Sequence, residues 1–226
     1  GKYPLILFLH GGGEKGNNNL SHLIANKGAV AWVEPDRVAR NPVYVLAPQC
    51  PTEPPGWINK ENQDLVVQIL EKFIQEHPQV DTDRIYIEGM SMGGMGTWEM
   101  ILEHPDLFAA AIPICGRVST SYYEDGGKKF DALANMPIWV AHAEDDPSVN
   151  VQGSDDAVAA LQAHGNTSVK YYKYLPESIW PNHHHSWKAV YEDEEIYNWL
   201  FEQNKSRTEN GTINPKTLYT VKDYGD

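Results

Sequence analysis

The sequence predicts an α/β protein with a doubly wound, mostly parallel sheet and helices on both of its faces. Short continuous apolar runs suit strands buried on both faces, and longer segments with apolar residues three and four positions apart suit helices lying on a sheet. The two kinds of segment alternate along the chain, which calls for crossover connections and therefore parallel strands. With 226 residues, the chain is long enough for one such domain and short for two.

The first expected strand is the run Leu5 to Leu9, which ends at a glycine-rich segment. The clearest helix spans 63–77, where six apolar residues recur at helical spacing. A later helix has Ser154 as its N-cap and Gly165 as its stop. The remaining elements follow the same two patterns, with strands at 43–46, 84–88, 108–114, 137–143 and 171–175, and helices at 93–103, 155–164 and 190–203.

Residues 204–226 differ in composition from the rest of the chain. They are polar and without period, so they offer no face that could join a core. We therefore expect one domain at residues 1–203 and a polar tail or linker at 204–226.

Composition and charge exclude several classes of protein. Hydrophobic residues make up 41% and charged residues 22%, which excludes a disordered or fibrous chain. The formal net charge of -13 works against binding nucleic acid or an anionic membrane, because like charges repel at long range. No run approaches the roughly 20 apolar residues that span a bilayer. We expect a small, neutral or weakly charged substrate, and neither nucleic acid nor a membrane as partner.

The cysteines indicate neither disulfides nor a metal site. Cys50 and Cys115 are too few for a disulfide framework and stand in no metal-ligand spacing. Cys115 follows the apolar run 109–114, which indicates a buried thiol.

A serine motif stands between a predicted strand and a predicted helix. Residues 89–93 read Gly-Met-Ser-Met-Gly, a G-x-S-x-G pattern. A hydroxyl on a sharp strand-to-helix turn needs small neighbours two positions away, since bulky ones would clash. Ser91 is therefore the candidate nucleophile.

The first predicted strand ends in His10 followed by glycines 11–13. Successive glycines let the backbone approach a ligand closely and turn N–H groups toward a developing oxyanion, as HGGG-type loops do in esterases. We assign the oxyanion donors to Gly11, Gly12 and Met92, the residue after the nucleophile.

An acid and a base follow the serine in the order that a Ser-acid-His triad uses. After the strand at 137–143, Glu144, Asp145 and Asp146 compete to orient a histidine, and Asp146, before a proline, is preferred. The general base comes from the three adjacent histidines at 183–185. Consecutive side chains point in different directions, which argues against a metal site. The residue chemistry leaves the choice among the three histidines open.

Several motifs in order resemble the α/β-hydrolase esterases that are often labelled predicted peptidases, relatives of feruloyl esterases, acetyl xylan esterases and polyhydroxybutyrate depolymerases. The resemblance covers roughly residues 3–203. Its motifs are HGGGEKG at 10–16, APQCP at 47–51, GMSMGG at 89–94, FAAAIPICG at 108–116 and HAEDD at 142–146.

The resemblance implies an α/β-hydrolase catalytic domain acting as a serine carboxylesterase. The expected substrates are small acyl or phenolic esters of the acetyl or feruloyl type, free or linked to polysaccharide, hydrolysed through an acyl-enzyme without cofactor or metal. Relatives also carry additional N-terminal strands, so we expect an incomplete sheet edge here. By the same resemblance a secreted location is favoured, while the oligomeric state stays open.

The resemblance also selects residues. In the family the catalytic histidine lies three residues before a tryptophan, in an H-x-S-W pattern, and here that selects His184, with Trp187 behind it. His183 stands where relatives have glycine, which keeps His183 and His185 as competitors. The acidic segment usually continues as Asp-x-x-Val-Pro, and its match here supports Asp146 although Asn150 replaces the proline.

Substrate contacts are assigned to His185 and Trp57. Trp57 follows the second predicted strand and either lines the pocket as an aromatic wall or anchors its loop on the domain. Two other functions stay open: a serine peptidase of the same fold, and a non-catalytic module of that fold that binds carbohydrate.

Overall fold

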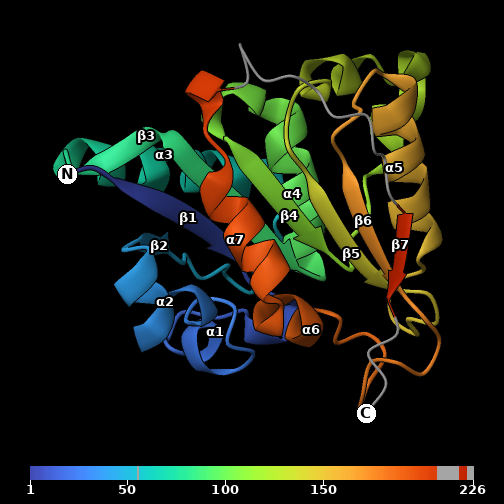
Figure 1. Ribbon diagram of the computed structural model, residues 1–226, viewed down its shortest axis with the longest axis horizontal. Coiled ribbons are helices and arrows are strands. Elements are labelled where there is room, and N and C mark those ends of the chain that lie inside the picture. Colours follow the sequence, from blue (N-terminus) through green and yellow to red (C-terminus); the bar gives the residue numbers. More distant parts are fainter. Residues whose placement is uncertain (55, 208–218, 223–226) are drawn as a thin grey trace.

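The computed structural model describes residues 1–54, 56–207 and 219–222. Its strands form one sheet in the order β2-β1-β3-β4-β5-β6-β7, and all neighbouring strands are parallel. The predicted doubly wound, mostly parallel α/β fold is confirmed (Figure 1). The strands are β1 (Tyr3–Leu9), β2 (Tyr44–Leu46), β3 (Val80–Met90), β4 (Ala110–Ile114), β5 (Trp139–Ala143), β6 (Lys170–Tyr174) and β7 (Tyr219–Lys222).

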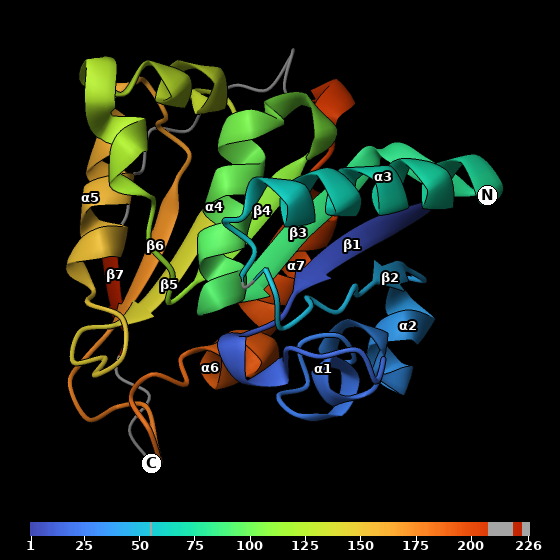
Figure 2. The same cartoon turned by 180° about the vertical axis from the view of Figure 1, so that it is seen from behind.

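Helices cover both faces of the sheet. One face carries α3 (Lys60–Glu76), α4 (Met92–Glu103) and α5 (Gln152–Ala163), which lie in front in Figure 2. The other carries α6 (Trp187–Glu192) and α7 (Glu194–Glu202), which lie in front in Figure 1. The remaining elements are α1 (Ser21–Ile24), α2 (Pro35–Arg40), η1 (Gly12–Glu14), η2 (Ala31–Val33), η3 (Pro105–Leu107), η4 (Thr120–Leu133) and η5 (Lys205–Arg207).

The central strands explain why the sequence shows unbroken apolar runs. In β1, Leu5, Leu7 and Leu9 belong to the core beneath α3 and α4, while Ile6 and Phe8 belong to the core beneath α6 and α7. All five side chains are fully buried. Alternate residues of a strand point to opposite faces, so a strand covered on both sides must be apolar throughout.

Two helices differ from prediction. The segment expected as one helix at 190–203 is divided into α6 and α7 at Asp193, whose side chain accepts hydrogen bonds from the N–H groups of Glu195 and Ile196 and so caps α7. Ser154, expected as an N-cap, lies inside α5. Gly165 follows the helix with φ of +88°, as a glycine stop requires.

Strand β7 was not expected, because it lies within the segment predicted as a polar tail. It pairs with the open edge of β6 through backbone hydrogen bonds, which need no apolar pattern. Residues 208–218 and 223–226 of that segment lie outside the described residues. None of the described helices has the length and apolar character needed to cross a membrane.

Candidate active site

Ser91 occupies a strained turn between β3 and α4. Its φ of 57° and ψ of -116° lie outside the regions that most residues adopt. The Ser91 N–H donates to the carbonyl of Ile114 on the neighbouring strand, at 2.9 Å, which helps to hold the turn. The hydroxyl is thereby presented beyond the carboxyl ends of the strands, where ligands of open parallel sheets bind.

The glycines of the motif are required by close backbone contacts. A Cβ at Gly89 would lie 2.4 Å from the carbonyl oxygen of Gly93, and one at Gly93 would lie 1.8 Å from that of Leu9. Gly94 and Gly116 also approach each other, since a Cβ at Gly116 would lie 2.5 Å from the Gly94 carbonyl carbon. The start of α4 can pack against the ends of β1 and β4 only with glycine at these positions.

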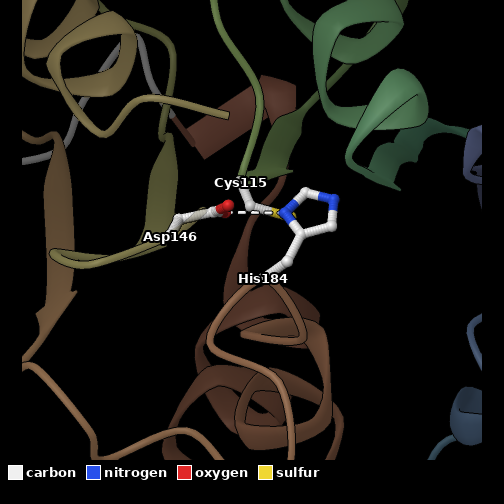
Figure 3. A group of neighbouring side chains, drawn as sticks. All are labelled: Cys115, Asp146 and His184. Carbon is white, nitrogen blue, oxygen red and sulfur yellow. Dashed lines mark hydrogen bonds and ion pairs between the residues drawn. The ribbon is translucent and has the colours of Figure 1, made fainter. Parts of the chain in front are cut away.

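The structure brings Ser91, His184 and Asp146 together. His184 Nε2 lies 2.8 Å from Ser91 Oγ, and His184 Nδ1 lies 2.7 Å from Asp146 Oδ2. An ionised carboxylate only accepts, so Nδ1 carries a proton and Nε2 is free to accept from the serine hydroxyl. Asp146 follows β5, and His184 precedes α6; Figure 3 shows these two side chains facing each other.

The other two histidines lie elsewhere. His183 Nδ1 pairs with Asp145 Oδ2 at 2.6 Å. The ring of His185 packs on Trp187, with the ring centroids 4.5 Å apart. Of the three adjacent histidines, the geometry therefore brings only His184 between Ser91 and a carboxylate.

Asp146 is buried and strongly hydrogen bonded. Its side chain is fully inaccessible to solvent, and its Oδ1 accepts from the N–H groups of Ser148 and Val149 at 2.8 and 2.9 Å. Burial opposes ionisation of Asp146, but hydrogen bonds from His142, His184 and the two N–H groups outweigh it and hold its pKa well below the usual range. The carboxylate is thus charged at neutral pH.

His142 is a contact that sequence reasoning missed. Its Nε2 lies 3.2 Å from Asp146 Oδ2 and 2.9 Å from the carbonyl oxygen of Val149, and its Nδ1 lies 2.7 Å from Ser154 Oγ. It is fully buried at the end of β5. The HAEDD motif contains it, but only the fold shows that a side chain four residues before Asp146 turns back to meet it.

The oxyanion loop requires one correction. The N–H of Gly11, assigned as a donor to substrate, donates instead to Glu14 Oε2 at 2.9 Å. Because η1 turns the chain back on itself, Glu14 reaches the start of its own loop. In the described part of the chain no backbone partner accepts from the N–H groups of Gly12 or Met92, and Met92 is the first residue of α4. These two N–H groups therefore stay candidate donors to an oxyanion.

Trp57 does not line the catalytic pocket, contrary to its assignment as a substrate contact. It is 3% exposed, and its Nε1 donates to the carbonyl oxygen of His10 at 2.9 Å. Its loop folds over the core beneath α3 and α4, so the indole packs behind the glycine loop. Of the two assigned substrate contacts, His185 does line the pocket.

The catalytic pocket is small. It has a volume of about 240 Å³, and its walls include Gly12, Ser91, His184 and His185. A larger cavity of about 750 Å³ adjoins it and is lined mainly by charged residues of the α2 and α6 regions. The two share three lining residues, Ala25, Asn26 and Trp187.

Cys115 lies beside the pair of Asp146 and His184 (Figure 3). Its sulfur, a carboxylate oxygen and an imidazole nitrogen lie within 4.8 Å of one another, and all three are atom types that bind metal ions. Burial raises the pKa of the Cys115 thiol, and the negative charge of Asp146 raises it further. The imidazole and carboxylate are hydrogen bonded to each other, so the group fits a triad better than a metal site.

Comparisons with known proteins find hydrolases of similar fold. The model of the prolyl oligopeptidase family matches residues 57–131, which include Ser91. A solved structure of a thermostable esterase is 41% identical, with a TM-score of 0.81, over 90% of this chain and 55% of that one. The present chain therefore spans little more than half the length of that esterase. No curated protein matches the chain.

Two more distant structures share the fold. Arabidopsis thaliana SOBER1 is 18% identical with a TM-score of 0.60, over 88% of this chain and 100% of that one. Pyrococcus horikoshii acylaminoacyl peptidase is 20% identical with a TM-score of 0.58, over 90% of this chain and 38% of that one. Together, the parallel sheet and these likenesses show that the chain has the α/β-hydrolase fold.

Proposed function

We propose that the protein is a serine carboxylesterase. Ser91 Oγ attacks the ester carbonyl carbon while His184 Nε2 takes the hydroxyl proton, and Asp146 orients the imidazole and stabilises its positive charge. The N–H groups of Gly12 and Met92 bind the oxyanion. When the C–O bond breaks, the alcohol leaves with the proton held by His184. Water then adds to the acyl-enzyme through the same histidine and releases the acid.

One observation carries this proposal: the continuous hydrogen-bonded chain from Ser91 Oγ through His184 to Asp146, with both links shorter than 3 Å. Such a chain raises the nucleophilicity of an alcohol and returns its proton to the leaving group. The N–H groups of Gly12 and Met92, which have no hydrogen-bond acceptor among the described residues, complete the requirements for acyl transfer.

Small acyl or phenolic esters, of the acetyl or feruloyl type, are the proposed substrates, either free or linked to polysaccharide. The catalytic pocket of about 240 Å³ supports a small group beside Ser91. The adjoining cavity of about 750 Å³ offers room for the bulkier half of the ester. The net charge of -13 favours uncharged esters over anionic ones.

The replacement Ser91→Ala tests the mechanism. We expect hydrolysis of p-nitrophenyl acetate to fall to a small residual rate, because the variant lacks the nucleophilic hydroxyl. Circular dichroism and thermal unfolding serve as controls for folding. Undiminished turnover in the folded variant contradicts the proposal. A panel of p-nitrophenyl acyl chain lengths, methyl ferulate and acetylated xylan then defines the preferred ester.

Amide hydrolysis is the second candidate, supported by the family match at residues 57–131. Esters and amides use the same triad and differ in the leaving group that His184 must protonate. Acetyl-phenylalanine methyl ester and the matching p-nitroanilide distinguish the two, because an esterase favours the ester far beyond its greater intrinsic reactivity.

A non-catalytic carbohydrate-binding module is the remaining alternative. A fluorophosphonate probe separates it from both hydrolases, since only an activated serine reacts. Labelling of the protein that is lost in Ser91→Ala excludes this alternative.

A further inference from the structure

Two consecutive peptide units form the start of the oxyanion loop, and hydrogen bonds fix both. In the first, the His10 carbonyl accepts from Trp57 Nε1 at 2.9 Å, and the Gly11 N–H donates to Glu14 Oε2 at 2.9 Å. A peptide unit is planar, so holding it at both its oxygen and its nitrogen leaves it little rotation. Trp57 and Glu14 thus clamp this unit from two sides.

The second unit joins Gly11 to Gly12. Its carbonyl oxygen accepts from His10 Nδ1 at 2.7 Å and from the Glu14 N–H at 3.3 Å. In a trans peptide the C=O and N–H bonds point in opposite directions. The His10 donor is fully buried, so the Gly12 N–H points away from the interior, and Gly12 is exposed beside the catalytic pocket.

His10 is a constant donor in this arrangement. Its Nε2 accepts from the Cys50 N–H at 2.9 Å, which assigns the proton to Nδ1. Burial is the main cause that lowers the pKa of His10 to about 4, so the ring is neutral at physiological pH. The direction of the Gly12 N–H bond therefore does not depend on the charge of the His10 ring.

Glu14 joins the loop to a separate segment of the chain. It is 3% exposed; Oε2 accepts from the Gly11 N–H, and Oε1 accepts from Asn26 Nδ2. In the described residues neither oxygen is hydrogen bonded to Ser91 or His184. Glu14 also lines the catalytic pocket, but both of its oxygens already accept hydrogen bonds from the protein, so its carboxylate holds the loop in place.

We propose that Glu14 is a positioning residue for oxyanion stabilisation, which holds the Gly11 peptide so that the next N–H, that of Gly12, meets the developing oxyanion. The inference rests on the proposed serine-hydrolase function. Glu14, the acid of the HGGGE motif, thus acts by holding the backbone of the loop. Removing its carboxylate should weaken stabilisation of the transition state more than it weakens substrate binding.

The test compares Glu14→Ala with Glu14→Gln on p-nitrophenyl acetate. Loss of a whole oxyanion donor lowers kcat by about 10²–10³-fold, and a donor that is only misaligned should lower it by about 10–100-fold. We expect that loss in Glu14→Ala with KM nearly unchanged. Glutamine keeps an oxygen for the Gly11 N–H, so Glu14→Gln should retain most of kcat. Affinity for a trifluoromethyl ketone, which forms a tetrahedral adduct, should fall in parallel with kcat.

Glu99 supplies a matched control. It is a buried glutamate of α4, 5% exposed, whose carboxylate accepts from Gln63 Nε2 at 2.9 Å and from Ser119 Oγ. Glu99→Ala should lower thermal stability as Glu14→Ala does, with kcat unchanged. A folded Glu14→Ala protein with wild-type kcat, or an equal loss of kcat in Glu99→Ala, overturns the proposal.

If Glu14→Ala does not fold, Asn26→Ala decides the question. Asn26 is only half-buried, and its removal frees one oxygen of Glu14. Because Asn26 lines the catalytic pocket, KM is not diagnostic here. We expect kcat and the affinity for the trifluoromethyl ketone to fall together, severalfold, and wild-type kcat contradicts the inference. Failure of the proposed function looks different, because the wild-type protein then neither hydrolyses the ester nor reacts with a fluorophosphonate.

Discussion

Asp146 receives hydrogen bonds from two imidazoles as well as from two backbone N–H groups. His184 links the carboxylate to Ser91, and the buried His142 contacts the same carboxylate oxygen, Oδ2. The position of Asp146 is therefore fixed from within the fold, independently of substrate. In the proposed mechanism, this arrangement pre-orients the imidazole that accepts the serine proton.

The substitution Asp146→Asn tests that role. The asparagine amide can donate to His184 Nδ1, which would place the imidazole proton on the wrong nitrogen, and we expect kcat to fall by about 10⁴-fold. Asp145→Asn is the control, because Asp145 pairs with His183 and not with His184. Steady-state kinetics on p-nitrophenyl acetate measures both. Equal losses in the two variants would show that local charge, not the triad contact, matters.

Among single residues, the sequence predicts the role of those whose function depends on their immediate neighbours in the chain. Ser91 could be chosen because a nucleophile turn needs glycines in a fixed pattern around it. Trp57 and Gly11 were misassigned, because their roles depend on distant groups that pack against them: the His10 carbonyl for Trp57, and the Glu14 carboxylate for Gly11. The sequence gives no measure of such contacts.

Among the elements, the junction of β3 and α4 is the most constrained. In Gly93→Ala the new Cβ would lie 1.8 Å from the Leu9 carbonyl oxygen, so β1 and α4 would have to separate. We expect a loss of more than about 3 kcal/mol in the free energy of unfolding, measured by urea denaturation. Gly13→Ala is the control, since its Cβ would meet no heavy atom within 4 Å, and a change within about 0.5 kcal/mol is expected. Comparable losses in both would contradict the steric account.

Glu88 links β3 to η2 and α6 through hydrogen bonds in the core beneath α6 and α7. This fully buried carboxyl on β3 accepts from Trp32 Nε1 of η2 and from the Tyr191 hydroxyl of α6, each at 2.9 Å. Burial raises its pKa to about 8, although both hydrogen bonds act in the opposite direction. The carboxyl is thus protonated in the folded state at neutral pH.

This raised pKa predicts a pH-dependent stability. Between about pH 4.5 and 8 the folded state holds a proton that the unfolded state has lost, so stability falls as pH rises through this window. Glu88→Gln should remove that slope, a difference on the order of 3 kcal/mol at pH 7. Urea unfolding from pH 5 to 8 measures it, with Glu71→Gln, on the exposed side of α3, as control. A slope unchanged in Glu88→Gln would contradict the assignment.

Elements with strong periodicity could be predicted, and those stabilised by backbone contacts could not. The unbroken run of β1 is buried as its pattern required, and Val66 and Leu70 of α3 are buried as well. Leu65 and Ile69, which belong to the same helical pattern, are 51% and 41% exposed. The break between α6 and α7 depends on one cap at Asp193, inside an otherwise continuous helical pattern. Strand β7 depends on the open edge of β6, which a sequence read segment by segment does not show.

For the whole molecule, the doubly wound sheet gathers the carboxyl ends of β3, β5 and β6 along one side, and Ser91, Asp146 and His184 follow these ends. The fold class could be predicted because alternation of strands and helices leaves few other topologies. The fold thereby brings together residues that lie far apart in the chain, and the segment around each residue does not show which others it will contact. The spatial choice of His184 over its two neighbours required the fold or a family resemblance.

The net charge of -13 gives the whole molecule a long-range preference among substrates. Cationic esters should be attracted, and added salt should weaken that attraction. We expect kcat/KM for acetylthiocholine to fall between 10 and 300 mM sodium chloride, concentrations chosen to span long and short Debye lengths of about 30 and 6 Å. Phenyl acetate is the neutral control, and the same salt response for both esters would contradict the prediction.

The clamped glycine loop has a consequence that nuclear magnetic resonance can follow. The Gly11 amide is tied to a buried carboxylate, whereas the adjacent Gly12 amide is exposed and has no backbone acceptor among the described residues. Neighbouring amides in one rigid turn should therefore exchange their hydrogens with deuterated solvent at very different rates. Formation of the tetrahedral adduct with a trifluoromethyl ketone should slow exchange of the Gly12 amide alone. The measurement therefore shows which amide donates to the oxygen of the adduct.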